Sequence, residues 1–125
     1  MIPPAIVLVI DDSDDTRDVY AVMLRLEGFV VEEARDGQEG IAKAIEFLPA
    51  LIITDLAMPV MDGWETIRRL RADERTRHIP IIACTGQDLP HKRPGPSADI
   101  VRAKPCPLDE LLLEVRHLVR RDAAA

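Results

Sequence analysis

Three aspartates in this sequence follow short apolar runs and could do chemistry together. Asp11 and Asp12 come directly after the run at residues 5–10, and Asp55 follows the run at residues 51–54. If these runs are parallel strands, their carboxyl ends lie at one edge of a sheet, where the sites of open α/β folds are found. Carboxylates gathered there repel one another, so the group predicts a bound cation.

A hydroxyl and an ammonium group follow two further apolar runs. Thr85 comes after residues 79–84, and Lys104 follows a short run around residues 100–101. Each of the five residues alone is an ordinary loop residue. Together they suit Mg²⁺, which takes hard oxygen ligands and a phosphate, and a carboxylate that attacks a phosphoryl group to form an aspartyl phosphate. Lys104 and Thr85 would contact the phosphoryl oxygens.

Strand and helix patterns alternate along the chain. Val19, Val22, Met23 and Leu26 recur at i, i+3, i+4 and i+7, a spacing that predicts a helix. Asp62, followed three residues later by a glutamate, predicts the start of another helix. Alternating strands and helices indicate an α/β fold, with a single doubly wound, five-stranded parallel sheet. Strands are predicted at residues 5–10, 29–34, 51–54, 79–84 and around 100–101, and helices around 19–26, 41–48, 63–70 and 107–119.

Length and composition restrict the class of protein. The chain has 125 residues, 47% of them hydrophobic, and a formal net charge of −6. We expect one domain over residues 1–125, with an ordered core at about 5–121. The acidic balance and the few aromatic residues argue against direct nucleic-acid binding. Cys84 and Cys106 form no disulfide framework, and neither a signal peptide nor a membrane-length apolar run is visible. We therefore expect a cytoplasmic protein without membrane contact.

Several segments resemble the receiver domain of two-component response regulators. They are residues 7–13 (VLVIDDS), residues 34–37 (ARDG), residues 53–63 (ITDLAMPVMDG), and Thr85 with Lys104-Pro105. The segment at 53–63 is the most specific, and the ordered set is more specific still. The resemblance covers essentially the whole chain. It implies a flavodoxin-like (βα)5 fold with strand order 2-1-3-4-5.

The resemblance implies a role for each residue of the predicted site. Asp55 resembles the phospho-acceptor, Thr85 the switch hydroxyl and Lys104 the family's lysine. Asp11 and Asp12 resemble the acidic pair that binds Mg²⁺ (or Mn²⁺). The implied metal ligands are Asp11, Asp12, Asp55 and the backbone carbonyl of Ala57.

The implied function is a phosphorylation-dependent switch. A sensor histidine kinase or a histidine phosphotransfer protein would donate a phosphoryl group to Asp55. The domain would catalyse its own phosphorylation and dephosphorylation, so it is not a conventional metabolic enzyme. The added charge would draw Thr85 inward and change the protein–protein contacts of the surface beyond it. The sequence leaves open whether this is a stand-alone receiver or a receiver cut from a larger chain.

The sequence departs from the family pattern in two places. Val101 stands where receivers usually carry an aromatic residue that changes rotamer on phosphorylation. Residues 88–97 contain three prolines and a glycine where the family has its fourth helix, and these residues disfavour a regular helix. We predict that the fourth helix is short, missing or irregular. An ordered loop stiffened by its prolines, without a special role, is the alternative.

Two other functions fit part of the sequence. Residues 12–16 (DSDDT) follow a strand and resemble the haloacid-dehalogenase-like phosphatases, with Asp12 as nucleophile and Asp14 as acid–base. This hypothesis leaves Asp55, Thr85 and Lys104 unexplained, and the chain is short for that family. The second alternative is a receiver-like adaptor that works without phosphorylation. The full set of site residues argues against it.

Overall fold

A computed structural model describes residues 4–86, 98–104 and 106–124, with side chains described as far as Arg120. One parallel sheet has the strand order β2-β1-β3-β4-β5, which confirms the predicted doubly wound α/β fold. The strands are β1 (Ile6–Ile10), β2 (Val30–Ala34), β3 (Leu51–Asp55), β4 (Ile81–Thr85) and β5 (Ile100–Ala103). The described helices are α1 (Asp14–Leu26), α2 (Gly37–Phe47), α3 (Gly63–Ala72) and α4 (Leu108–Ala124).

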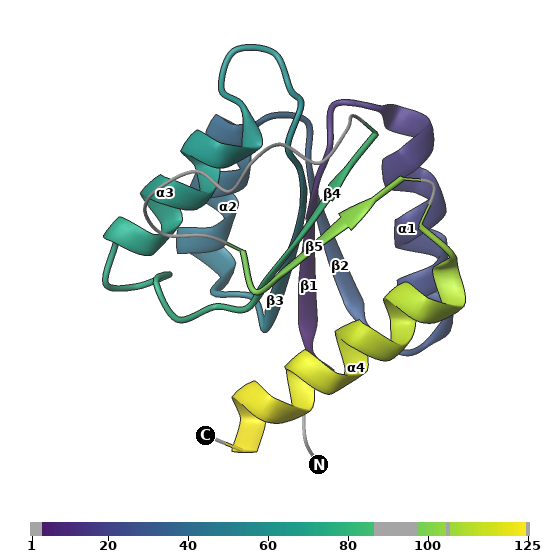
Figure 1. The fold of residues 1–125 in the computed structure, drawn as a ribbon. Coiled ribbons are helices and arrows are strands. Elements are labelled where there is room, and N and C mark those ends of the chain that lie inside the picture. The colour runs from purple at the N-terminus through teal and green to yellow at the C-terminus, as the bar shows by residue number, and fades with distance from the viewer. Residues whose placement is uncertain (1–3, 87–97, 105, 125) are drawn as a thin grey trace.

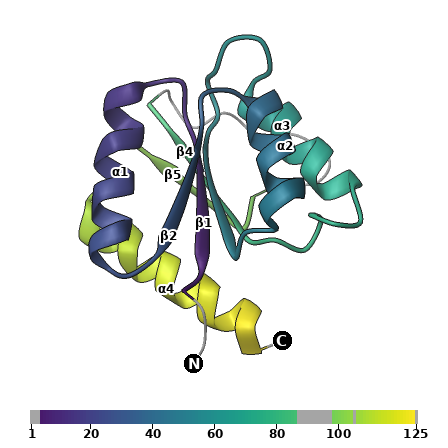
Figure 2. The same ribbon diagram turned by 180° about the vertical axis from the view of Figure 1, so that it is seen from behind.

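Two hydrophobic cores lie on opposite faces of the sheet. Helices α1 and α4 cover one face, and α2 and α3 cover the other (Figures 1 and 2). Neighbouring residues of one strand serve different cores: Val7 and Val9 pack toward α1 and α4, whereas Leu8 and Ile10 pack toward α2 and α3. A strand that is apolar on both faces follows from this double cover. The central strands therefore hold whatever follows them in fixed positions.

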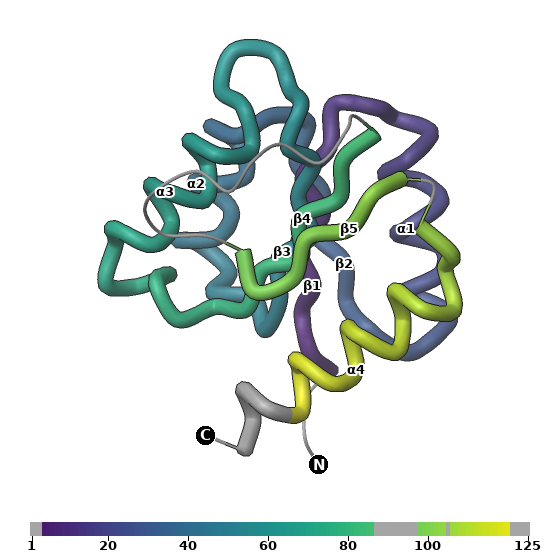
Figure 3. Tube along the Cα trace, in the orientation of Figure 1, coloured from purple at the N-terminus to yellow at the C-terminus, as the bar shows by residue number. Residues whose placement is uncertain are grey.

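The strand register places the residues of the predicted site at one edge of the sheet. Ile10 pairs with Thr54, so Asp11 and Asp55 leave neighbouring strands at the same level. Asp55 pairs with Cys84, and Thr85 pairs with Ala103, just before Lys104. The loop between β3 and α3 stands above this edge in the chain trace (Figure 3).

Side-chain caps fix the starts of the helices that follow this edge. Ser13 Oγ accepts a hydrogen bond from the amide of Thr16, 3.3 Å away, at the start of α1. Asp36 Oδ1 caps α2 through the amide of Glu39, at 2.8 Å. At α3, Asp62 accepts from the amide three residues on, at 2.9 Å, as its sequence pattern predicts. Such caps satisfy amides that have no partner within the helix.

The apolar stripe from which α1 is predicted is not its buried face. Val22 is 57% and Leu26 is 82% exposed. The side chains that α1 buries are Arg17, Tyr20, Ala21 and Leu24. These have the same i, i+3, i+4, i+7 spacing, so periodicity correctly predicts the helix but not the side that faces the sheet.

The predictions about the family's fourth helix fall largely outside the described residues. Residues 87–97 are not described, so a short, missing or irregular helix there stays a prediction. Val101 lies on β5 and is 39% exposed. Within the described residues, none of the helices is both long enough and apolar enough to cross a membrane.

Candidate functional site

The three predicted aspartates meet at the carboxyl edge of the sheet. Each of Asp11, Asp12 and Asp55 offers one carboxylate oxygen, and these oxygens all lie within 4.8 Å of one another. Asp11 is 1% and Asp55 is 8% exposed, whereas Asp12 is exposed to solvent. Two of the three carboxylates are therefore buried, and the group opens to solvent at Asp12. Oxygen ligands arranged in this way suit a hard divalent cation that keeps several of its waters.

Lys104 completes the polar group from β5. Its Nζ lies 3.0 Å from Asp11 Oδ2 and 3.5 Å from Asp55 Oδ2. Burial by itself lowers the pKa of Lys104, but its hydrogen bond and attraction to Asp11, together with Asp55, outweigh burial and raise that pKa. Lys104 is therefore a fixed positive charge beside Asp55 at neutral pH.

The pKa of Asp55, and so its charge, depends on its burial and its neighbours. Burial raises the pKa of its carboxyl group above the ordinary aspartate value. The amide of Ala57, which donates to Asp55 Oδ1 at 3.1 Å, and the Lys104 ammonium offset only part of this rise in pKa. The Asp55 carboxylate is thus partly desolvated and has a partner at each of its oxygens.

Thr85 and Ala57 are brought to the same edge. Thr85 is 2% exposed at the end of β4, and its backbone carbonyl accepts from the amide of Lys104 at 2.7 Å. This bond sets the distance between the strands that carry the two residues. Ala57 lies two residues beyond Asp55 in the chain. The roles of Thr85 as switch hydroxyl and of the Ala57 carbonyl as metal ligand stay predictions.

Gly63 allows α3 to begin directly against Asp55. A Cβ at this position would lie 2.1 Å from the backbone oxygen of Asp55 and 2.6 Å from the Cα of Leu56. Backbone atoms cannot move aside as a side chain can. We expect Gly63→Ala to lower the free energy of unfolding by about 1–3 kcal/mol, measured by urea denaturation. Gly86→Ala is the control, since the one described atom that its Cβ would meet is Lys104 Cδ, at 4.0 Å; an equal loss there would contradict this account.

Val60, in the loop between β3 and α3, has a left-handed backbone. Its φ is 69° and its side chain is 86% exposed. Left-handed backbone costs an L-residue roughly 1–2 kcal/mol, and glycine avoids this cost while losing about 0.5–1 kcal/mol in entropy. We expect Val60→Gly to raise the free energy of unfolding by about 0.5–1 kcal/mol. Val60→Ala keeps its Cβ and should gain little; equal gains in both variants would contradict the explanation.

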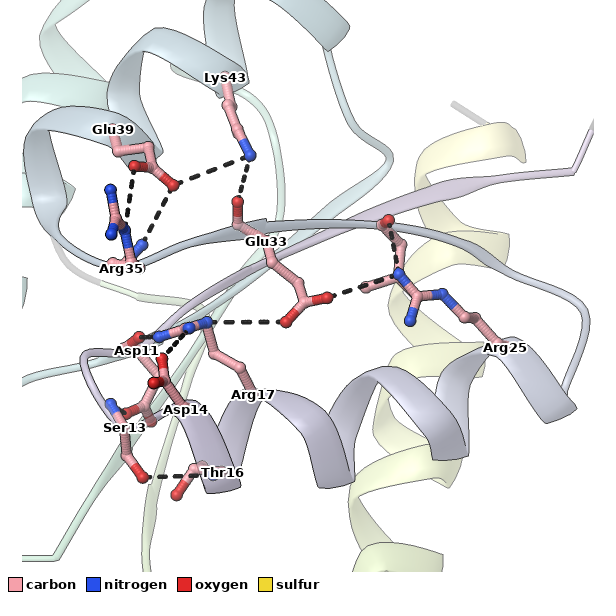
Figure 4. A network of polar contacts seen from close by, with 11 residues as sticks. Asp11, Ser13, Asp14, Thr16, Arg17, Arg25, Glu33, Arg35, Glu39 and Lys43 are labelled. Atoms are coloured by element: carbon pink, nitrogen blue, oxygen red, sulfur yellow. Dashed lines mark hydrogen bonds and ion pairs between the residues drawn. The ribbon is translucent and has the colours of Figure 1, made fainter.

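One residue that contacts the site is missed by the sequence patterns. Arg17 lies on the buried face of α1, 8% exposed, and its Nη1 donates to the backbone oxygen of Asp11 at 2.7 Å (Figure 4). A charged residue on a helix normally marks the solvent side, so its position was not predicted. The signal in the sequence is that Arg17 shares a helical face with Tyr20, Ala21 and Leu24.

The chain matches known proteins over most of its length. A family model described as "Response regulator receiver domain" matches residues 7–116. The chain is 40% identical over 119 residues to the DNA-binding dual master transcriptional regulator RpaA of Synechocystis sp., covering 92% of this chain and 49% of that protein. It is 35% identical to the transcriptional regulatory protein TrcR of Mycobacterium tuberculosis, covering 96% of this chain and 47% of TrcR. The chain thus spans about half the length of these relatives.

Solved structures agree with the sequence matches. The chemotaxis protein CheY4 of Vibrio cholerae superposes with a TM-score of 0.81 at 32% identity, covering 92% of this chain and 98% of CheY4. The receiver domain of sensor histidine kinase PA1611 from Pseudomonas aeruginosa has a TM-score of 0.84 at 28% identity, covering 93% and 98% of the two chains. These matches support the receiver and not the phosphatase alternative. The chain belongs to the response regulator receiver domain family.

Proposed function

We propose that Asp55 of this receiver accepts a phosphoryl group from a phosphohistidine while Mg²⁺ is bound beside it. The observation that carries the proposal is the group formed by Asp11, Asp12 and Asp55, with Lys104 Nζ within 3.5 Å of two of them. A buried carboxylate next to an ammonium group and a cation site is arranged for phosphoryl transfer.

The donor set of the site fits Mg²⁺. Three carboxylates against one ammonium leave an excess of two negative charges, which one divalent cation would neutralise. Asp11, Asp12, Asp55 and the Ala57 carbonyl would hold the ion. When bound, it would supply charge neutralisation for the phosphoryl oxygens. The related receiver of PA1611 was solved with a magnesium ion coordinated in its active-site cleft, which supports the proposal.

The residues of the chain would divide the reaction between them. A carboxylate oxygen of Asp55 forms a bond to phosphorus as the phosphorus–nitrogen bond of the phosphohistidine breaks, and the electron pair stays on the imidazole. Lys104, already 3.5 Å from Asp55, contacts an oxygen of the transferred group. The hydroxyl of Thr85 would bond another phosphoryl oxygen and so draw the end of β4 toward the site. The new charge thereby changes the surface beyond β4.

The phosphodonor we propose is a sensor histidine kinase or a histidine phosphotransfer protein. The output is a change in protein–protein contacts made by residues 1–125 as a single receiver unit. A cytoplasmic location fits the two buried cysteines, Cys84 and Cys106, which are both free, because free thiols are typical of reducing compartments.

Labelling with a small phosphodonor tests the proposed reaction. Radiolabelled acetyl phosphate should label the chain when Mg²⁺ is present and fail to do so in excess EDTA. Label that is independent of the metal would overturn the proposal.

Partners are tested by pull-down with untreated protein and with protein treated with beryllofluoride, a phosphoryl mimic. Identical partner lists would contradict a phosphorylation-dependent switch and favour the adaptor alternative.

A further inference from the structure

Arg17 is a buried cation behind the acidic group, and the proposed reaction does not use it. Its guanidinium contacts the loop after β1, the first turn of α1 and strand β2 (Figure 4). Nη1 donates to the backbone oxygen of Asp11 at 2.7 Å, Nη2 pairs with the carboxylate of Asp14, and Nε lies 3.6 Å from Glu33 Oε1 on β2. A planar group with donors in fixed directions can satisfy all three partners, which an ammonium group cannot do with the same geometry.

The carbonyl that Arg17 holds belongs to the peptide group joining Asp11 to Asp12. The other polar groups of Asp11 are also fixed: its amide donates to the Ala34 oxygen at 3.1 Å, and its carboxylate accepts from the Ser13 amide and from Lys104. The hydrogen bond from Arg17 acts directly on this peptide, because it holds the peptide's carbonyl oxygen and so restricts the plane of the group. The direction in which Asp12 leaves the chain depends on that plane.

Glu33 keeps the guanidinium in its place. Its Oε2 lies 3.5 Å from Arg25 Nη2, and its backbone oxygen accepts a hydrogen bond from Lys43 Nζ of α2 (Figure 4). Arg25 shares Glu33 with Arg17, but the contacts found for it among the described residues are to Glu33 and to the backbone oxygen of Val31. The two arginines thus differ in the one contact that reaches the site.

We propose that Arg17 is a positioning residue for the cation site: its hydrogen bond to the Asp11 carbonyl aims the carboxylates of Asp11 and Asp12 at Asp55. This inference rests on the proposed function, because the cation it concerns is Mg²⁺. Removing Arg17 would change the Mg²⁺ affinity in two opposite ways. Loss of a nearby positive charge strengthens cation binding, whereas loss of the hydrogen bond to the Asp11 carbonyl weakens it. Whether the measured affinity rises or falls therefore shows which effect is larger.

The test is the Mg²⁺ affinity of the full chain, measured by isothermal titration calorimetry. Arg17→Met should weaken Mg²⁺ binding roughly 10–100-fold, the usual effect of removing a group that orients metal ligands. Arg25→Met is the matched control: it removes the same charge from the same helix and should bind Mg²⁺ as well as the unaltered chain, or more tightly. Mg²⁺ binding by Arg17→Met that equals or exceeds that of the unaltered chain would overturn the inference.

Two further measurements keep this result separate from a loss of folding. Arg17→Lys retains the charge, so weaker Mg²⁺ binding in this variant reports geometry alone, and unaltered binding would overturn the inference even if Arg17→Met does not fold. Acetyl phosphate labelling of Arg17→Lys should need more Mg²⁺ for half-maximal rate but reach the same rate at saturation. If the unaltered chain binds no Mg²⁺, the proposed function fails and this inference fails with it.

Discussion

Asp55→Asn is expected to show no incorporation of phosphate from acetyl phosphate. The carboxylate oxygen that would bond to phosphorus is lost, and no other carboxylate has the same pair of contacts to the Ala57 amide and to Lys104 among the described residues. Label is measured on the purified protein after denaturing electrophoresis. Asp109→Asn, an exposed change in the first turn of α4, should be labelled at the normal rate.

Asp55→Asn should also be at least as stable as the unaltered protein at neutral pH, so loss of label would not reflect unfolding. Burial raises the pKa of Asp55 in the folded state, so the folded protein binds this proton more tightly than the unfolded chain does. Stability from this group is therefore lost as the pH rises through the folded pKa. A neutral asparagine avoids that loss.

One labelling result would contradict the proposal that Asp55 is the phospho-acceptor. Label that persists in Asp55→Asn and disappears in Asp12→Asn would identify Asp12 as the nucleophile, as in the haloacid-dehalogenase-like alternative. The structure offers that alternative little support, because Asp14, its expected acid–base, is paired with Arg17.

Lys104→Met is expected to slow labelling by acetyl phosphate about 100-fold at saturating Mg²⁺. The variant lacks the charged donor beside Asp55, and removing one such donor from a site of developing negative charge costs roughly 10²–10³ in rate. Lys43→Met is the matched control: it removes the same side chain from α2, where Lys43 contacts Glu33 and Glu39, and it should label normally. An equal loss of rate in both variants would contradict a direct role for Lys104.

The pH dependence of the labelling rate in Lys104→Met is a second, independent test of the role of Lys104. The Lys104 charge lowers the pKa of Asp55, and in the proposed reaction Asp55 would have to be ionised to attack phosphorus. Removing that charge should raise the pKa of Asp55 further, so the acid side of the rate profile moves to higher pH. A profile that is unchanged or moves to lower pH would show that Lys104 does not act on the ionisation of Asp55.

The sequence is enough to predict that the site residues lie close together, because their positions depend only on where the strands end and how the strands pair. Each residue follows a strand, and parallel strands end at one edge. The register pairs Ile10 with Thr54, just before the two aspartates, and Thr85 with Ala103, just before Lys104. The structure confirms the strand order and the grouping of the three aspartates. What sequence cannot give is the degree of burial, and the raised pKa of Asp55 follows from burial.

The face of α1 could not be predicted from periodicity alone, because two stripes on this helix have the same spacing. The more apolar stripe, which includes Val22 and Leu26, faces solvent, and the stripe that begins with Arg17 faces the sheet. The buried stripe holds an arginine because that arginine has partners at Asp11 and Glu33. A contact between residues far apart on different elements leaves no local pattern in the sequence.

The lysine of the site is held by a less buried strand than the aspartates are. The aspartates leave β1 and β3, central strands buried along almost their whole length, whereas Lys104 leaves β5, an edge strand whose residues alternate between partly buried and exposed. Edge segments with little buried surface open locally at a lower free-energy cost than the core does. Brief detachment of β5 would withdraw the lysine and leave the acidic group intact. If Lys104 contacts the phosphoryl group as proposed, the rate of phosphorylation would vary with this local opening, independently of global unfolding.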